Sequence, residues 1–504
     1  MGIADRVRDK KLLSRIVQAN EAVSIIKGQM TIATTGNSFS GFPRTLLLGL
    51  AEHLSRTDEK VTLFCIGALG EDIEEAFEKG NTISKRLGSL GNKAARRAVN
   101  DGKVSFLDVK SGVFPEQVAR GDFGKVDVAL IEAAAITKEG NIIPSTALSD
   151  GPRWVECAER VLIEINPMVP PSIEGIHDIY LPGPYPDRRP IPLEKIDQRI
   201  GTSYIPVGND QISGIVETVH SLRESERFSR ESEANIQIAE NVVSYLEKMA
   251  NTGIIPLPFP PLEVGIGNLG AAIMKKFQES SFDKIHLYLP GITEPVLDLI
   301  DSGKVNFVSA TNLRIGKEGL ERLFSGLEHY RDHILLRSID VINSGEVIRR
   351  LGVIAINTAI EIDILGQVNS SHMMGVNVIG GIGGSYDYSR NAMLSIFATP
   401  SVAQQGEISS IVPLVSHVDH TEHDVDVVIT EQGIADLRGL EPMDRAHRIV
   451  ESCAHPSYRS ALTEYLEKAK KNGSGRQPLV LEEAFSFHQR FARSKSMKMA
   501  FSMG

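Results

Sequence analysis

The segment GIGNLG at residues 265–270 has a glycine spacing found in ligand-binding loops. The pattern GxGxxG is typical of dinucleotide-binding turns, but such a site also needs a strand directly before it and an acidic residue about 20 positions later. Residues 255–262 before it are rich in proline, and we expect them not to form a central strand. Two readings therefore stay open beside a dinucleotide site: a tight turn into a helix, and a loop whose amides approach a ligand carbonyl or phosphate.

A second glycine cluster, GGIGGS, occupies residues 380–385. It lacks the Gly-Lys-Ser/Thr ending of a P-loop, which excludes nucleotide binding of that kind. Glycines at this density either let backbone N–H groups surround an anion or a flat group, or serve a loop that needs positive φ.

Three histidines, His417, His420 and His423, follow one another at intervals of three positions, with Asp419 and Glu422 between them. Such residues could supply metal ligands, but the spacing matches no standard zinc motif. We therefore predict a hydrogen-bonded His/Asp network that holds a loop, and no metal site.

Predicted strands and helices alternate along the chain around these motifs. Strand-like runs such as VDVALIE at residues 126–132 are typical of strands buried on both faces. This alternation predicts an α/β fold with mostly parallel or mixed sheets. Strands are expected at residues 30–35, 61–66, 126–132, 160–165, 284–289, 305–309 and 426–430, and helices at 13–26, 44–55, 236–249, 296–300, 317–330, 444–453 and 458–469.

Two halves of similar α/β character are separated by a charged stretch at residues 222–235. We interpret this stretch as a solvated linker, which gives two domains at residues 1–225 and 226–504. A surface helix within a single domain is the alternative.

The composition of the 504 residues is that of a globular protein, and its size suits two or three domains. The net charge of −10 argues against nucleic acid or an anionic membrane as a partner.

Three widely spaced cysteines give neither a disulfide framework nor a zinc finger. No apolar run approaches the roughly 18 residues of a membrane span, and residues 1–12 lack the apolar core of a signal peptide. We expect a cytoplasmic protein.

The C-terminal third, together with residues 265–269, resembles the acetyl-CoA hydrolase/transferase family, class I CoA-transferases of the succinyl-CoA:acetate and propionyl-CoA:succinate type. The likeness rests on VIRRLG at 347–352, GIGGS at 381–385, SHVDH at 416–420, TEQGIADLRGL at 430–440 and CAHP at 453–456. Segments VALIE at 128–132 and EGIHD at 174–178 look similar, so the likeness covers nearly the whole chain.

The resemblance implies two related CoA-transferase-type domains with a cleft between them, and a covalent mechanism. In such enzymes a glutamate carboxylate attacks the acyl thioester and carries CoA as a glutamyl thioester to a second carboxylate. It further implies an acyl-CoA and a carboxylate as substrates, no permanently bound cofactor, and a homo-oligomer such as a homodimer. The residues expected to contact CoA are Gly265, Ile266, Gly267, Asn268, Leu269, Gly380, Gly384 and Gln404.

The sequence departs from the family pattern at the nucleophile. The family glutamate follows the glycine loop at a fixed distance, and an ungapped comparison through residue 303 puts Pro290 at that position. Proline has no carboxylate and cannot form the glutamyl thioester. Gln404 and Glu407 also stand where the family has lysines, and the loss of a cation there should weaken binding of anionic CoA. Asn343 resembles a family active-site asparagine.

Two other acids could take over a catalytic role. Glu294 lies four residues after Pro290 and precedes a proline suited to the first turn of a helix, so it is either a displaced nucleophile or a helix-capping acid. Glu263 stands directly before the glycine loop, where the family has glutamine, and could act as a general base for water.

The function expected from these residues is that of an acyl-CoA-processing enzyme acting on short-chain acyl-CoA and carboxylates, diverged because Pro290 replaces the nucleophile. One alternative is hydrolysis of a thioester, or of an activated C–C bond in a CoA ester, without a covalent intermediate. A second is a non-catalytic CoA-ester binding or regulatory protein. A dinucleotide oxidoreductase would give a nicotinamide signal on titration, and we expect none.

Overall fold

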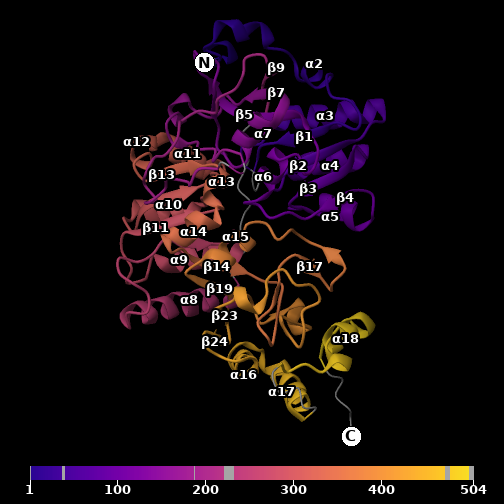
Figure 1. Ribbon diagram of the computed structural model, residues 1–504, viewed down its shortest axis with the longest axis vertical. Coiled ribbons are helices and arrows are strands. Elements are labelled where there is room, and N and C mark those ends of the chain that lie inside the picture. Colours follow the sequence, from indigo (N-terminus) through magenta and orange to yellow (C-terminus); the bar gives the residue numbers. More distant parts are fainter. Residues whose placement is uncertain are drawn as a thin grey trace. The chain divides into compact units, whose positions relative to one another are not determined.

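The computed structural model describes residues 2–36, 40–184, 186, 188–220, 232–471 and 477–498 (Figure 1). It divides into two compact units: unit 1 holds residues 1–227 and 286–351, and unit 2 holds residues 228–285 and 352–504. The predicted domains 1–225 and 226–504 are continuous, whereas residues 286–351 pack with the N-terminal part of the chain. The two packing units therefore divide the chain at other positions than the predicted domains do, and the predicted domain boundary stays a prediction. Most of the predicted linker lies outside the described residues.

Unit 1 contains a parallel sheet in the order β4-β3-β2-β1-β5-β7-β9, with the short β6 antiparallel to β5. Every residue of β5, Val126–Ile136, is buried, as expected for a strand covered on both faces. The other strands are β1 (Thr31–Thr34), β2 (Val61–Cys65), β3 (Ile83–Gly88), β4 (Ser105–Leu107), β6 (Ile142–Pro144), β7 (Ala158–Ile165) and β9 (Ile212–Glu217). The helices of this part are α1 (Ile3–Arg6), η1 (Lys10–Arg15), α2 (Ala19–Val23), α3 (Arg44–Thr57), α4 (Glu71–Gly80), α5 (Lys93–Asn100), α6 (Phe114–Ala119) and α7 (Gly151–Cys157).

The core of this sheet includes an aromatic cluster on β2, α6 and α7. The Phe64, Phe114 and Trp154 rings contact one another with centroids 5.5–6.4 Å apart, and Phe123 joins Phe64 and Phe114. Tilted and edge-on arrangements of this kind suit the charge distribution of aromatic rings. Trp154 is fully buried.

Unit 1 also contains strands in the order β11-β12-β13-β8. The strand β8 (His177–Asp178) joins β13 as a parallel neighbour. The elements are β11 (Ile285–Leu289), α10 (Glu294–Asp301), β12 (Val305–Ala310), α11 (Lys317–Ser325), α12 (Leu327–Tyr330), β13 (Ile334–Arg337), α13 (Ile339–Ile342) and α14 (Gly345–Leu351), with η2 (Pro171–Ile173) before β8.

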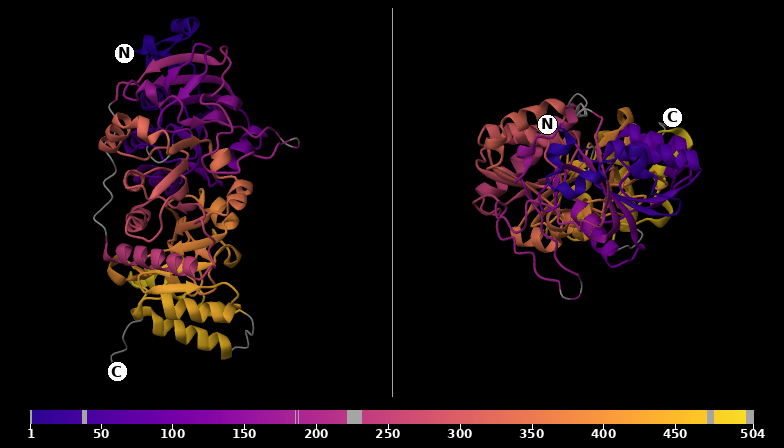
Figure 2. Two further views of the ribbon diagram at one scale, coloured as in Figure 1. Left: turned by 90° about the vertical axis from the view of Figure 1, so that its left-hand side faces the viewer. Right: turned by 90° about the horizontal axis from the view of Figure 1, so that it is seen from above.

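Unit 2 contains strands in the order β24-β23-β19-β14-β10, parallel except for the β23–β24 pair. Helices α16 (Pro442–Cys453) and α17 (Pro456–Lys471) lie side by side (Figure 2). The remaining elements are α8 (Glu233–Asn251), β10 (Leu262–Val264), α9 (Asn268–Phe277), β14 (Ile354–Thr358), β15 (Glu361–Asp363), β16 (Val368–Asn369), β17 (His372–Met373), β18 (Asn377–Val378), α15 (Ser385–Asn391), β19 (Leu394–Ala398), β20 (Val402–Ala403), η3 (Gln404–Gly406), β21 (Ile408–Ser409), β22 (Ile411–Val412), η4 (Glu422–Asp424), β23 (Val427–Thr430), β24 (Gly433–Asp436), η5 (Leu481–Glu483) and α18 (Ser486–Ser494).

The predicted α/β class with mostly parallel sheets is confirmed. The predicted helix at 13–26 is wrong in its middle, because Ile16 and Val17 are extended and pair with Ile215. The predicted absence of a strand before the glycine loop is also wrong: β10 pairs with β14 in the sheet. The prolines at 256, 258, 260 and 261 all precede this short strand, so none of them interrupts its hydrogen bonds. Among the described residues, no helix is both long and apolar enough to cross a bilayer.

Candidate functional site

The glycine loop of unit 2 connects β10 directly to α9. The Gly265 amide donates to Ile356 O at 2.8 Å and so continues the ladder of β10 with β14. Gly267, at φ 149° and ψ −178°, caps α9 in a conformation that is essentially restricted to glycine. A Cβ on Gly270 would lie 2.0 Å from Gly265 O, so glycine is required there by the close approach of two backbone segments.

The residues predicted to contact CoA differ in exposure along this loop. Gly265, Ile266 and Gly267 are partly exposed and Asn268 is exposed, whereas Leu269 is buried in the first turn of α9. The partly exposed backbone amides lie at the carboxyl end of a parallel strand and at a helix N-terminus. Such N–H groups can donate hydrogen bonds to a carbonyl oxygen or an anion.

Glu263 lies on β10 two residues before the loop and is 2% exposed. Burial raises the pKa of its carboxyl to about 8, although a hydrogen bond from the Ile356 amide lowers it in part. Its Oε2 atom has no hydrogen-bond partner among the described residues. An unpartnered buried carboxyl is costly, so this group is either protonated or satisfied by a bound molecule.

Two polar residues that the sequence did not single out lie near Glu263 in the sheet. Asn357 on β14 and Ser395 on β19 are buried, and Asn357 Nδ2 and Ser395 Oγ also have no partner among the described residues. The sequence signal would have been a polar residue within each apolar run, IAINT and LSIFA. That signal does not tell which face of the sheet the residue occupies.

Pro290 and Glu294 lie in unit 1, after β11. Pro290 follows the last residue of that strand, and its carbonyl accepts a hydrogen bond from the Thr311 hydroxyl. Glu294 begins α10, and its Oε1 accepts a hydrogen bond from the Gly316 amide at 2.6 Å. This bond satisfies the amide that precedes α11, which agrees with a structural role for Glu294.

Asn343 directly follows α13 in unit 1 and is 3% exposed. On the same helix, Asp340 accepts a hydrogen bond from Arg153 at 2.8 Å. Both side chains of this ion pair are buried, so the pair fixes α13 against α7 and thereby positions Asn343.

The second glycine cluster and the Gln404 segment lie in unit 2. Gly380 and Gly384 are partly exposed, and Gly384 precedes α15. Gln404 is exposed and, like Gln405, has a positive φ. Glu407 forms a 2.7 Å ion pair with Lys498. In this part of the chain a glutamate paired with a lysine therefore stands where the family that the sequence resembles has a lysine.

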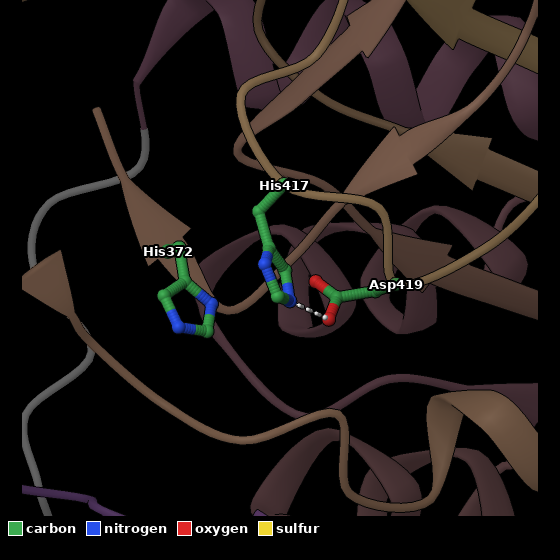
Figure 3. Close-up of side chains that lie close together, drawn as sticks. All are labelled: His372, His417 and Asp419. Carbon is green, nitrogen blue, oxygen red and sulfur yellow. Dashed lines mark ion pairs between the residues drawn. The ribbon is translucent and has the colours of Figure 1, made fainter. Parts of the chain in front are cut away.

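The His/Asp network predicted for residues 417–423 is present, with His372 as an added member. His417 Nε2 lies 3.3 Å from Asp419 Oδ1, and His417 lies between His372 and Asp419 in Figure 3. The His372 and His417 rings are stacked with centroids 3.8 Å apart. The ligand-type atoms of these three residues all lie within 4.8 Å of one another, which is the only such group among the described residues. His423 is largely exposed and lies outside this network.

Hydrogen-bond donors already surround Asp419. Its carboxylate accepts from the Ser370 amide at 2.6 Å, from the Ser370 hydroxyl and from the Ser371 hydroxyl. Each of these bonds ties residues 416–420 to the segment before β17. The contacts therefore support a loop-holding role for the network.

His420 links the same loop to α15. Its Nε2 lies 3.1 Å from Ser385 Oγ and its Nδ1 lies 3.1 Å from Ser389 Oγ. Burial lowers the pKa of His420 to about 4, so the ring is neutral at physiological pH. One ring nitrogen then donates and the other accepts.

Two family models match this chain: the acetyl-CoA hydrolase/transferase N-terminal domain at residues 1–217 and the C-terminal domain at residues 319–466. The chain belongs to the acetyl-CoA hydrolase/transferase family. It is 40% identical to a succinyl-CoA:acetate CoA-transferase of Clostridium kluyveri, over 98% of this chain and 92% of the relative. It is 34% identical to an acetyl-CoA hydrolase of Candida glabrata, over 99% of this chain and 98% of the relative.

Solved structures agree with the fold of this family. RipA from Yersinia pestis superposes with a TM-score of 0.70 at 22% identity, covering 94% of this chain and 100% of RipA. For the acetyl-CoA hydrolase/transferase chain described here, the glycine loop and Glu263 thus lie in unit 2, and Glu294 and Asn343 lie in unit 1.

Proposed function

We propose that this member of the acetyl-CoA hydrolase/transferase family hydrolyses short-chain acyl-CoA thioesters without forming a glutamyl thioester. The observation that carries the proposal is Pro290 at the carboxyl end of β11, where the family resemblance calls for the nucleophilic glutamate. A pyrrolidine ring offers no nucleophile. Relatives of the family include an acetyl-CoA hydrolase as well as CoA-transferases, so water as the final acceptor fits the family chemistry.

The remaining acids differ in their ability to replace the glutamate. The Glu294 carboxylate is held by the Gly316 amide, so an attack on a thioester would break a helix-terminal contact. Glu263 has a free oxygen and, because burial raises its pKa to about 8, it exchanges a proton near physiological pH. A general base works best when its pKa lies near the operating pH. Glu263 is therefore our candidate base.

The loop amides and Glu263 would then each act in one step of hydrolysis. The partly exposed amides of the loop at residues 266–267 would hold the thioester carbonyl oxygen as negative charge develops on it. Glu263 would accept a proton from the attacking water. The CoA sulfur leaves when the C–S bond breaks and is protonated. Coenzyme A enters as part of the substrate, and no bound cofactor takes part.

The test is mass spectrometry of the intact protein after incubation with acetyl-, propionyl- or succinyl-CoA and quenching with borohydride, with free CoA assayed in parallel. Borohydride reduces a glutamyl-CoA thioester to an alcohol and releases CoA, which leaves a fixed mass change on the glutamate that peptide mapping can locate. We expect CoA release and no reduced glutamate from the wild-type chain. The matched variant Pro290→Glu supplies the missing carboxylate, and a reduced residue at that position is its expected result. A reduced Glu294 in the wild-type chain would refute the proposal and restore covalent transfer.

A second candidate function is a CoA-ester binder without turnover. It is favoured by Pro290, which removes the nucleophile of the family while the glycine loop at residues 265–270 is kept. Isothermal titration with CoA together with the hydrolysis assay separates the candidates. Binding without turnover on any of the three thioesters would support the binder.

A further inference from the structure

Among the buried polar atoms of unit 2 that have no hydrogen-bond partner among the described residues, three belong to neighbouring strands: Glu263 Oε2 on β10, Asn357 Nδ2 on β14 and Ser395 Oγ on β19. Their residues are 2%, 5% and 2% exposed. Leaving such a group without a partner is costly, so buried polar atoms of folded proteins are almost always satisfied by protein or by ordered water.

The strand register puts all three side chains on one face of the sheet. Glu263 is the neighbour of Ala355, and Ala355 is the neighbour of Ser395. Neighbouring residues of parallel strands share a face, and Asn357 shares that face because it lies two positions after Ala355. The three polar residues therefore surround Ala355.

The residues between the three polar side chains are small. Ala355 has only a methyl group, and Gly265, the next residue on this face of β10, has no side chain. A Cβ built on Gly265 would lie 3.9 Å from Asn357 Oδ1, which places that amide beside the bare glycine. Gly265 is partly exposed, so this face of the sheet reaches the loop that we propose holds the thioester.

The opposite face of β10 is apolar and is covered by α9. Val264 points to that face, since its side chain lies 3.4 Å from the Cβ position of Gly270 on α9. On the polar face, Phe397 follows Ser395 by two positions and contacts His420, with ring centroids 4.8 Å apart. His420 is in turn held by α15, which packs on β14 and β19. The polar face is thus covered by α15 and by His420 of the neighbouring loop.

We propose that Glu263, Asn357 and Ser395 bind the water molecule that attacks the thioester. A water with three polar partners matches the usual coordination of buried water. Asn357 Nδ2 donates to the water oxygen, Ser395 Oγ orients it, and Glu263 Oε2 accepts its proton. This inference rests on the proposed function. It adds Asn357 and Ser395 as positioning residues and assigns the source of the nucleophile.

The proton and electron balance of this step is complete. The water oxygen forms a bond to the thioester carbon while one water proton passes to the Glu263 carboxylate. The C–S bond breaks with its electron pair on sulfur, and the proton held by Glu263 is delivered to that sulfur. The products are a carboxylic acid and CoA, and Glu263 returns to its carboxylate form.

The first test compares Glu263→Gln and Ser395→Ala with the wild-type chain in acyl-CoA hydrolysis. Loss of a general base should lower kcat about 10²- to 10⁴-fold in Glu263→Gln. Loss of one hydrogen bond to the water should lower kcat about tenfold in Ser395→Ala with KM unchanged. The matched control is Ser409→Ala, because Ser409 is equally buried in the same unit but its hydroxyl donates to Ile411 O. Wild-type kcat in Glu263→Gln would overturn the inference and leave hydrolysis itself standing.

The second test does not depend on turnover. Infrared difference spectra at pH 6 should show the C=O stretch of a protonated carboxyl that disappears in Glu263→Gln and shifts in Ser395→Ala, because the bound water has lost a partner. Glu361→Gln should leave this band unchanged, since Glu361 is bonded to His488, Ser416 and Asn369. A band unaffected by Ser395→Ala would overturn the water site. A chain with the expected band and shift but no hydrolysis would retain the water site and refute the proposed function.

Discussion

The buried carboxyl of Glu263 should make the stability of this protein depend on pH in a direction opposite to that of most acidic residues. Burial raises the pKa of Glu263 from its ordinary 4.5 to about 8 in the folded state. The unfolded chain therefore releases this proton near pH 4.5, whereas the folded chain keeps it until about pH 8. The folded state binds more protons throughout this window, so the free energy of unfolding falls as pH rises through it.

The size of the effect follows from the width of the window. Each unit of pKa difference corresponds to about 1.36 kcal/mol, so the contribution of Glu263 falls by about 5 kcal/mol between pH 4.5 and pH 8. Glu263→Gln has nearly the same shape and no titration. We expect the variant to gain stability over the wild-type chain with rising pH, by about 1.4 kcal/mol per unit between pH 5 and pH 8.

Urea unfolding followed by circular dichroism at several pH values measures this difference. Glu361→Gln is the control: burial alone would raise the pKa of Glu361, but the bonds from His488, Ser416 and Asn369 hold it below its usual value. That group stabilises the fold above pH 4.5 and loses its contribution in acid, so its variant should approach the wild-type chain as pH falls. Parallel stability curves for Glu263→Gln and the wild-type chain between pH 5 and pH 8 would refute the buried, proton-holding carboxyl.

Three further outcomes are expected. Gly267→Ala should lower the free energy of unfolding by about 1–3 kcal/mol. The new methyl group would contact no other atom, but alanine is strained in this backbone conformation. A melting temperature equal to that of the wild-type chain would contradict this. Glu294→Ala should cost about 1–2 kcal/mol through the lost bond to the Gly316 amide while CoA release continues; loss of turnover with unchanged stability would make Glu294 catalytic. Asp419→Ala should cost about 2–3 kcal/mol because several donors lose their acceptor, whereas dialysis against EDTA should leave the melting temperature unchanged, and a drop on dialysis would establish a metal ion in the network.

Most of the fold was predictable because its strands are buried on both faces and appear as apolar runs. The run at residues 126–132 became the start of β5, and the run at 426–430 became β23. Elements that depend on distant partners were not predictable. The helix expected at 13–26 is interrupted because Ile16 and Val17 pair with Ile215, and β8 exists as a strand because β13 lies beside it.

The sequence predicted the backbone of the candidate site but only some of its side chains. Glycine spacing located the loop at 265–270, since Gly267 and Gly270 meet backbone requirements that are local. Asn357 and Ser395 could not be joined to Glu263 from the sequence, because they are brought together only by the register of three strands. His372 joined the histidine network in the same way, across 45 positions of sequence from His417.

The single tryptophan of the chain lies in the aromatic cluster of unit 1. Its fluorescence therefore reports the environment of that unit alone, while Glu263 and the histidine network lie in unit 2. An emission change that precedes or follows the loss of helical signal would mean that the two units unfold as separate cooperative blocks. Coincident transitions would mean that the two units unfold as one cooperative block. The proton bound at Glu263 in unit 2 would then also affect the stability of unit 1, and the fluorescence of the single tryptophan would report it.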